Sequence, residues 1–419
     1  RSYNNQEWNP AGSIARSNAH SRELGAILNT YLQVNPIEKL TLRTQFGANA
    51  HYRRSDSFVP KFNMDPLEKQ DLNEITRRNQ EWFDWNWTNT ATYMDTFAEK
   101  HNLNVMAGFT AERFAWYNTQ ARRDNVPNNL DQMQEVNAGQ QGTDEANGET
   151  TYNTLVSFLG RVMYNYDNRY YISASLRADG SSRFHPDHRW GTFWSIGASW
   201  KIMQEEFMKD TSDWLSNLSL RASYGAQGND QVGYYAYQAL YSIRNNLGES
   251  GLHAYRLATP NLSWETNLNT NIGLDFGFWN NRLSGTIEYF ERRSKDLLFS
   301  KDLVPSSGFS SMDENIGAIK NYGWEFQISG YPIMTKDWKW KLSFNATTYK
   351  NKITSLPAEE MWSGNKKWVK GGSLYDFYLV EWAGVNPENG NPMWYRYNTN
   401  GEKVTTEDYS STTPDDKVK

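Results

Sequence analysis

The sequence predicts an all-β fold, and more narrowly an antiparallel transmembrane β-barrel, from three observations. About twelve segments alternate apolar and polar residues with a period of two, and many are long enough for a tilted strand to cross a bilayer. Short and long connections alternate along the chain, which is the asymmetry of outer-membrane barrels. Aromatic residues make up 15% of the sequence and often lie beside the short connections, where such barrels carry interfacial girdles.

The composition excludes several other classes of protein. The chain has 419 residues, a formal net charge of −5 and no cysteine, which rules out disulfide scaffolds, cysteine nucleophiles and thiolate metal sites. Its mean hydropathy of −0.81 and the lack of any run of about 18 apolar residues argue against membrane helices. The mild acidity provides no basic field for nucleic acid. We expect no signal peptide, because the chain opens on RSYNNQEWNP.

The strands follow from the alternation, taken in chain order. The clearest covers 217–225, where Leu218 and Leu220 alternate with Ser219 and Arg221. A period of two places the two sets on opposite faces of a sheet. The predicted strands lie near residues 21–34, 38–53, 82–97, 101–116, 153–166, 169–179, 190–202, 217–225, 270–278, 281–295, 324–329 and 338–347.

The connections between these strands are of two kinds. The expected short turns are Asn35-Pro36, Glu99-Lys100, Asp167-Asn168, Asn280-Asn281 and Thr335-Lys336-Asp337. One short-side connection, 205–216, is longer and is expected to contain a helical turn. The expected long extracellular loops cover about 54–80, 117–151, 227–262, 297–320 and 352–419. A soluble sandwich or propeller gives no reason for this asymmetry.

Aromatic residues in two of the long loops are the candidates for substrate contact. Sugar rings can stack on aromatic faces, but aromatic side chains also dominate protein interfaces, so both interpretations stay open. The dense run near the C-terminus supplies Trp362, Trp368, Tyr375, Tyr378 and Trp382. A second, weaker candidate is the pair Tyr234 and Tyr235.

The sequence gives no convincing enzyme site, and we expect neither catalysis nor a bound metal or other cofactor. No GxSxG, HExxH, P-loop or GxGxxG motif occurs. His185 and His188, with Asp187 between them, are interpreted as the polar tip of a connection. One weak possibility is Ca²⁺ bound by loop acids, although a solvated loop is the preferred interpretation. Those acids are Asp124, Asp131, Glu135, Asp144, Glu145 and Glu149.

Three longer segments carry a family resemblance. They are LGRVMYNYDNRYYISASLRADGSSRF at 159–184 with its continuation at 189–208, LSNLSLRASYGAQGND at 215–230, and LSWETNLNTNIGLDFGFWNNRLSGTIEYFERRSKDLLF at 262–299 with its continuation at 316–330. As a set they resemble the barrel of SusC-like TonB-dependent transporters of Bacteroidetes outer membranes. GGSLYDFYLVEWAGVNPENGNPMWY at 371–395 is similar to a late extracellular loop of that family, and the resemblance covers nearly the whole chain.

The resemblance implies a larger barrel than this chain supplies. Such transporters have about 22 strands and a plugged lumen. Residues 1–419 would then form a partial barrel with about 12 of roughly 22 strands. The plug domain and the closing strands are expected to be absent from this chain and to come from the rest of the polypeptide, with a second chain as the alternative.

The polar faces of the predicted strands are expected to point into the lumen. A lumen wall in contact with the plug is the preferred role for these residues, over substrate contact. Charge on the lipid face would cost about 2–4 kcal/mol near the midplane, which supports the inward assignment. The residues are Arg43, Arg161, Arg177, Arg221, Asp275, Glu288 and Glu325.

The resemblance also implies a function and partners. It implies TonB-dependent active import of a nutrient, most often an oligosaccharide, across the outer membrane of a Gram-negative, Bacteroidetes-type bacterium. The implied partners are a SusD-like surface lipoprotein, TonB of the inner-membrane energising complex, outer-membrane lipid, and an oligosaccharide or peptide substrate. The alternatives are import of peptides, an adhesion or structural barrel that transports nothing, and a soluble β-rich carbohydrate-binding protein or enzyme.

Overall fold

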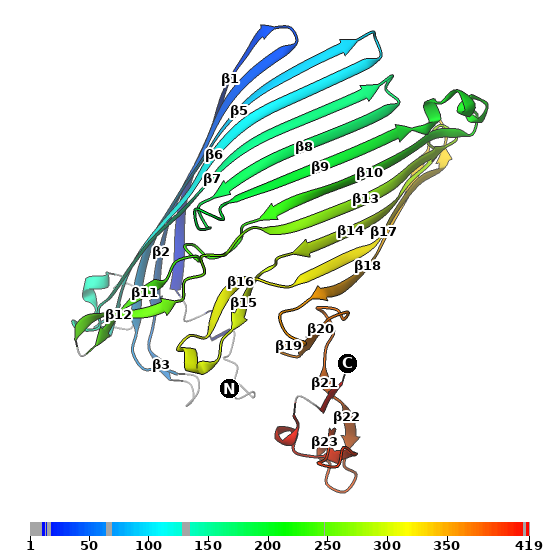
Figure 1. Ribbon diagram of the computed structural model, residues 1–419. Helices are drawn as coiled ribbons and strands as arrows, with labels where there is room; N and C mark the ends of the chain where they lie inside the picture. The colour runs from blue at the N-terminus through cyan, green and yellow to red at the C-terminus, as the bar shows by residue number, and fades with distance from the viewer. Residues whose placement is uncertain are drawn as a thin grey trace.

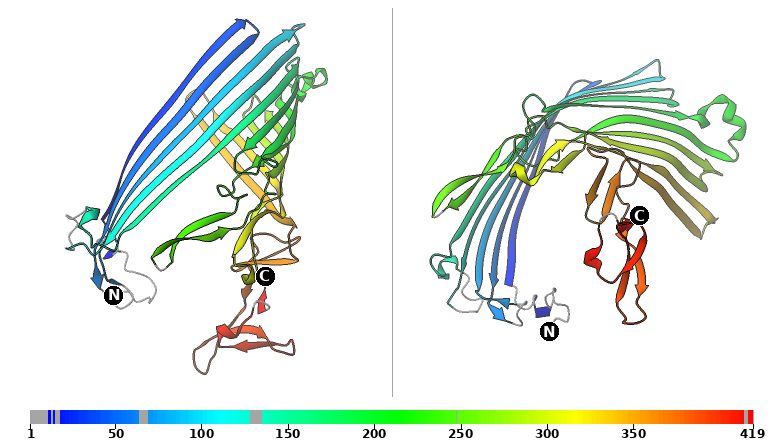
Figure 2. Two further views of the ribbon diagram at one scale, coloured as in Figure 1. Left: turned by 60° about the vertical axis from the view of Figure 1, so that its left-hand side comes forward. Right: turned by 60° about the horizontal axis from the view of Figure 1, so that its bottom comes forward.

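A computed structural model describes residues 11–12, 14, 18–63, 69–127, 135–246, 248–413 and 416–418. Within these residues one twelve-stranded antiparallel sheet dominates the molecule, as predicted (Figure 1). Neighbouring strands of this sheet follow chain order, and the sheet curves into an open arc (Figure 2). No helix of the described residues is long and apolar enough to cross a membrane.

Each predicted strand overlaps one strand of the large sheet, although some predicted ends, such as 38–39 and 281–282, lie one or two residues outside it. These strands have 12 to 24 residues, longer than the five or six that are usual in soluble proteins. In order across the sheet they are β1 (Asn18–Ile37), β2 (Leu40–Val59), β5 (Glu74–Phe97), β6 (His101–Asp124), β7 (Glu145–Tyr166), β8 (Tyr170–Ser181), β9 (Trp190–Lys201), β10 (Leu215–Asn229), β13 (Glu265–Phe278), β14 (Leu283–Lys295), β17 (Ala318–Met334) and β18 (Lys339–Ser355).

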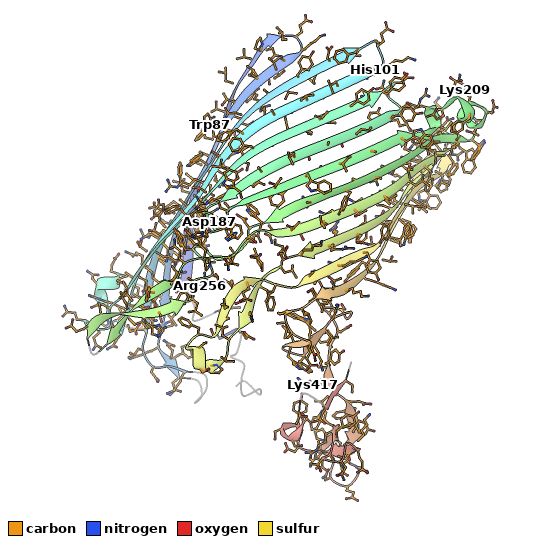
Figure 3. The ribbon with its side chains drawn as sticks, in the orientation of Figure 1. Trp87, His101, Asp187, Lys209, Arg256 and Lys417 are labelled. Carbon is orange, nitrogen blue, oxygen red and sulfur yellow. The ribbon has the colours of Figure 1, made fainter. Side chains whose placement is uncertain are left out.

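The short connections gather at one end of the sheet, which we call the turn end. Asp167 and Asn168 both have φ of 54°, and Asn280 and Asn281 have φ of 53° and 61°. Two successive positive φ values are typical of type I′ turns, whose twist matches that of the flanking strands. The expected helical turn of 205–216 is confirmed as η3 (Glu206–Thr211), and η2 (Ile202–Gln204) lies directly before that connection. Figure 3 labels His101 and Lys209 at this end.

Two expectations about connections are wrong. The first turn is at Glu38-Lys39, because β1 continues to Ile37 through a register shift that contains Asn35 and Pro36. Proline has no N–H to donate to the ladder, so a bulge accommodates it. The loops expected at 54–80 and 117–151 are also too wide, because β2, β5, β6 and β7 continue well into them. Polar residues occupy both faces there, which hides the alternation.

The opposite end, which we call the loop end, carries the small sheets and the remaining 3₁₀ helices. A buried cluster of Phe184, Val232, Ala236 and Leu262 packs against Trp264 and fixes three connections to one another. Arg256 and Lys417 mark this side in Figure 3. The remaining elements are β3 (Phe62–Asn63), β4 (Lys69–Gln70), η1 (Val136–Ala138), β11 (Leu240–Asn246), β12 (Glu249–Arg256), β15 (Leu298–Asp302), η4 (Pro305–Ser307), β16 (Ser311–Asn315), β19 (Glu360–Ser363), β20 (Lys366–Val369), β21 (Leu379–Val380), β22 (Trp382–Val385), β23 (Pro392–Tyr397), β24 (Lys403–Thr406), η5 (Tyr409–Ser411) and β25 (Lys417–Val418).

The pairing register separates an apolar face from a polar face. Residues paired directly across an antiparallel ladder point to the same side of the sheet. From β10 to β18 one row of the apolar face pairs Leu220, Leu274, Ile287, Phe326 and Ala346. The adjacent row, on the polar face, pairs Ser219, Asp275, Thr286, Gln327 and Asn345. A barrel in a bilayer must turn the first of these faces to lipid.

Two aromatic rows cross the apolar face. Near the turn end, Tyr170 stacks on Tyr166 and on Trp200, with ring centroids 6.4 Å apart in both pairs. Nearer the loop end, the second row consists of Trp87, Phe109, Phe158 and Trp190. On β7 the rows are eight residues apart, about 27 Å along the strand and about 20 Å in height at a tilt of about 40°. That separation suits the apolar band of a barrel, which is about 25 Å tall.

Candidate functional site

The seven polar residues predicted to face the lumen share the polar face. Positions that pair across the sheet point to the same side, and tracing these pairs from Arg43 on β2 to Glu325 on β17 keeps to one side throughout. Arg161, between Met106 and Ser175, lies on the same side. The register therefore brings them to one surface, which is the geometry that a lumen wall requires.

Arg221 is the centre of the best-connected group on the polar face. Its Nε lies 3.2 Å from Asp275 Oδ2, and its Nη2 contacts Glu288. Gly273 lies directly between them, paired with Arg221 on one side and Glu288 on the other. A Cβ at Gly273 would be 2.8 Å from Arg221 Cζ, so only glycine leaves room for the arginine to lie across β13. Thr286 donates a hydrogen bond of 2.7 Å to Asp275.

Two of the other three predicted arginines also have local partners. Arg177 donates to Asp179 Oδ1 at 2.6 Å and to Ser157 Oγ at 2.9 Å. The Arg43 guanidinium lies 4.3 Å from the centre of the Tyr31 ring. These contacts engage part of each guanidinium group within the wall and leave less of it to bind a ligand.

The C-terminal aromatic run forms a cationic aromatic cluster at the loop end. Trp362 and Tyr378 meet edge to face, with ring centroids 6.1 Å apart. Lys367 Nζ lies 5.3 Å from the Trp362 ring and 6.0 Å from the Tyr378 ring, and Lys417 Nζ lies 5.1 Å from Trp362 on β19. Such cation–π contacts hold ammonium groups against aromatic faces. We call Trp362, Lys367, Tyr378 and Lys417 the aromatic–lysine cluster.

The other predicted aromatic residues do not join this cluster. Trp368 packs on Phe299, with ring centroids 5.9 Å apart, and Tyr375 lies 5.4 Å from Lys366 Nζ. Trp382 belongs to the small β22–β24 sheet, where it contacts Trp394 at 5.9 Å. The residues of this dense aromatic run therefore divide among separate contacts in the fold.

Tyr234 and Tyr235 lie in a third place, beside the buried loop cluster. Arg183 lies over the Tyr234 ring at 4.9 Å, and Tyr235 meets Tyr152 of β7 edge to face at 6.2 Å. Arg183 also donates to the carbonyl oxygen of Val232 at 2.6 Å. These tyrosines are therefore packed between the loop and the strand ends.

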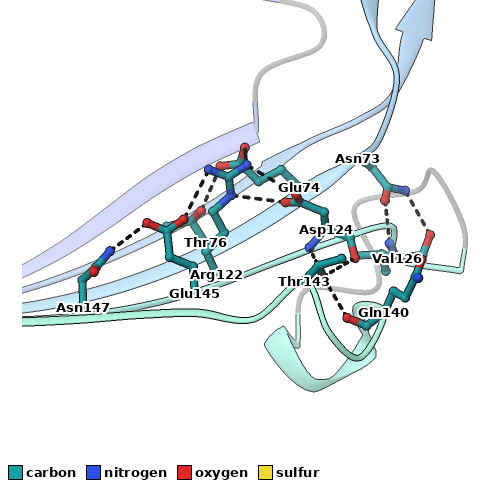
Figure 4. A network of polar contacts seen from close by, with 10 residues as sticks. All are labelled: Asn73, Glu74, Thr76, Arg122, Asp124, Val126, Gln140, Thr143, Glu145 and Asn147. Carbon is teal, nitrogen blue, oxygen red and sulfur yellow. Dashed lines mark hydrogen bonds and ion pairs between the residues drawn. The ribbon is translucent and has the colours of Figure 1, made fainter. Parts of the chain in front are cut away.

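The acids considered for Ca²⁺ contact arginines instead of one another. Arg122 reaches Glu74 at 3.1 Å, Asp124 at 3.2 Å and Glu145 at 3.6 Å (Figure 4). Glu135 contacts Arg77 at 3.2 Å, and Asp144 contacts Arg123. Glu149 lies on β7, and Asp131 lies outside the described residues. Among the described residues, no three His, Asp or Glu side chains form a metal-binding group.

Sequence reasoning missed the lysines of the aromatic–lysine cluster. Lys366 and Lys367 are adjacent in sequence, and the two-residue period would have assigned them to opposite faces of β20. Lys417 is 55 residues away from Trp362, and only the β21–β25 pairing brings it close. The available signal for a cationic aromatic site was the position of Lys366 and Lys367 between Trp362 and Trp368 in the sequence.

Comparison with known proteins establishes the family. The family model described as TonB-dependent receptor-like, β-barrel, matches residues 1–416. The chain belongs to this TonB-dependent receptor family. The predicted resemblance is thereby confirmed, and so is the location in the outer membrane of a Bacteroidetes-type bacterium. The alternative of a soluble β-rich protein is excluded.

The relatives of this TonB-dependent receptor barrel are longer than the chain itself. The TonB-dependent receptor P39 of Formosa agariphila is 30% identical over 374 residues, which cover 87% of this chain and 35% of P39. SusC of Bacteroides thetaiotaomicron is 39% identical over 273 residues, which cover 59% of this chain and 27% of SusC. The solved RagAB peptide transporter matches with a TM-score of 0.85 and 30% identity over 95% of this chain and 45% of its own.

Proposed function

We propose that the complete polypeptide containing this chain imports a nutrient through the outer membrane, driven by TonB. In this proposal the twelve strands form one wall of the barrel, and further strands of the same polypeptide close it. The observation that carries the proposal is the similarity to SusC together with a continuous polar face opposite an apolar one. An enzymatic step is not part of it, because the barrel binds and conducts its cargo without breaking a bond.

The proposed cargo is an oligosaccharide, captured at the loop end. The aromatic–lysine cluster supports this, because Trp362 and Tyr378 offer apolar ring faces on which sugar C–H groups can stack. A surface lipoprotein of the SusD type would cover this end. The alternative of a non-transporting adhesion barrel predicts loops of the same kind without uptake.

Import of peptides is the second candidate. The observation that favours it is the similarity to the RagAB peptide transporter along 95% of the chain. Backbone amides and side chains of a peptide could equally contact aromatic loops, since tyrosine and tryptophan are enriched at protein interfaces.

Uptake in whole cells tests these proposals. A strain that lacks the gene is complemented with the complete gene and given radiolabelled oligosaccharides or peptides. We expect uptake of one class only, and we expect it to stop when TonB is deleted. Uptake that persists without TonB would contradict active import, and no uptake of either class would favour the adhesion barrel. Capture of a lipoprotein with the tagged transporter tests the partner.

A further inference from the structure

A row of basic side chains crosses the apolar face near the loop end. Arg293 of β14 pairs directly with Lys320 of β17, and Lys320 pairs with Lys352 of β18. All three therefore point to the same side, on adjacent strands that are about 4.8 Å apart. Lys295 and Lys350 lie two residues from Arg293 and Lys352 and share their side. We call these five residues the basic patch.

The basic patch carries more positive charge than its surroundings neutralise. Glu291 is the acid on its side, and its carboxylate contacts Arg293 at 2.7 Å and Lys320 at 2.5 Å. Tyr289 donates a further hydrogen bond of 3.2 Å to it. Lys295, Lys350 and Lys352 are exposed and form no ion pair with the described residues. Five cations and one anion leave a local charge of about +4.

The position of the patch relative to the apolar band indicates which part of the bilayer it faces. Toward the turn end, the next paired residues on the same side are Tyr289 and Trp324, whose rings are 5.3 Å apart. Ile287 and Phe326 follow, so the band begins directly below the aromatic pair. Glu291 and Lys320 lie two and four residues beyond that pair, about 7 and 13 Å along the strands.

That distance corresponds to the headgroup region of the bilayer. At a tilt of about 40°, Arg293, Lys320, Lys350 and Lys352 lie about 5–10 Å above the aromatic pair, and Lys295, six residues beyond Tyr289, lies about 15 Å above it. Headgroups extend about 5–8 Å beyond the hydrocarbon core on each side of a bilayer. The loop end is the extracellular end of the barrel, because short turns are periplasmic. The patch therefore faces the headgroups of the outer leaflet and not the lumen or the free solvent.

We propose that the basic patch binds the phosphate groups of an outer-leaflet lipid headgroup. Phosphate oxygens accept charge-assisted hydrogen bonds from arginine and lysine, and several cations on adjacent strands can share one or two phosphates. Lys320 Nζ lies over the Tyr322 ring at 4.9 Å and also contacts the Glu291 carboxylate at 2.5 Å, so two contacts position this ammonium before a ligand arrives. The three lysines without an ion pair among the described residues lie on the same side of the sheet and supply the attraction.

The complete transporter in detergent micelles allows a direct test. Its melting temperature is measured with a bisphosphorylated lipid A, with the same lipid after removal of both phosphates, and with inorganic phosphate alone. We expect lipid A to raise the melting temperature of the wild type, and the other two probes to leave it unchanged. Equal stabilisation by the dephosphorylated lipid, or the same shift with inorganic phosphate alone, would overturn the proposal.

Substitution of the unpaired lysines assigns the effect to the patch. In Lys295→Glu/Lys350→Glu/Lys352→Glu, the Glu291 contacts remain, so the barrel is expected to fold and to lose at least about tenfold in apparent affinity for lipid A. The matched control, Lys100→Glu/Lys209→Glu/Lys336→Glu, makes the same change of charge at the turn end and is expected to respond like the wild type. A patch variant that keeps the wild-type affinity would refute the proposal. Equal weakening in the control would do so as well, because it would show an effect of net charge alone.

Discussion

Arg122 shows how single residues hold the strand ends above the membrane. Its guanidinium faces Glu74, Asp124 and Glu145, which would repel one another without it. We expect Arg122→Ala to speed amide hydrogen exchange at the loop ends of β5, β6 and β7 about threefold to tenfold, which is about 0.6–1.4 kcal/mol for partly exposed pairs. Arg78→Ala is the matched control, because Arg78 binds the neutral Gln120. Equal exchange in both variants would contradict this role.

A second prediction at the scale of residues concerns the space that Gly273 leaves for Arg221. Alanine there would place a Cβ 2.8 Å from Arg221 Cζ, so the arginine must leave Glu288 while the strand itself stays paired. We expect Gly273→Ala to destabilise the barrel by about 0.5–1.5 kcal/mol, seen as a lower temperature of unfolding on heat-modifiability gels. Gly160→Ala is the control, because its Cβ would meet nothing closer than 3.9 Å. A similar shift in both variants would mean that strand glycines matter only through propensity.

At the scale of elements, the turns depend on residues that tolerate positive φ. Asn168 has φ of 54°, a region that β-branched residues avoid. We expect Asn168→Gly to stabilise the barrel by about 0.5–1 kcal/mol and Asn168→Val to destabilise it by about 1–2 kcal/mol. Refolding into detergent, followed by gel shift, measures both. Lys336 has no positive φ and is the control. Lys336→Gly should not stabilise the barrel, and Lys336→Val should not destabilise it as Asn168→Val does.

Contacts of Glu205, in the connection after β9, predict that the stability of the barrel depends on pH. The Tyr170 hydroxyl and the Trp200 indole donate to Glu205, and the Tyr170 bond in particular holds the pKa of that carboxyl below its usual value. The stabilisation is complete above the ordinary pKa of 4.5 and is lost as the pH falls through the lowered one. We expect Glu205→Gln to remove this acid-sensitive part of the unfolding temperature. Glu206 is the control: Lys209 also lowers the pKa of its carboxyl, so Glu206→Gln should lose that separate contribution and retain the part that depends on Glu205.

The elements also show where sequence reasoning succeeds and fails. Alternation located all twelve strands because one side of each must be apolar in a bilayer. It ended β6 too early because Arg122 and Asp124 continue the strand with charges on the polar face, where neighbouring strands still satisfy the backbone. The alternation could not predict the contacts within the loops, for a different reason. Lys417 contacts Trp362 through the fold of the 54 residues between them, and the alternation of apolar and polar residues carries no information about such a contact.

At the scale of the whole molecule, the division into two faces predicts opposite outcomes for neighbouring residues. Phe326 lies on the apolar face and Gln327 on the polar face, next to each other on β17. Because the apolar face meets lipid, we expect Phe326→Lys to destabilise the complete barrel by about 2–4 kcal/mol and to reduce its assembly in the outer membrane. Gln327→Lys is expected to assemble normally, since its ammonium would enter a polar surface beside Thr286 and Asn345.

Membrane fractionation and heat-modifiability gels measure this pair of variants. The comparison controls for charge, size and position along the strand, because the two substitutions introduce the same side chain one residue apart. If both variants assembled equally well, the polar face would not be the lumen wall. The seven polar residues from Arg43 to Glu325 would then lose their proposed place inside the barrel, and the basic patch would lose its contact with lipid.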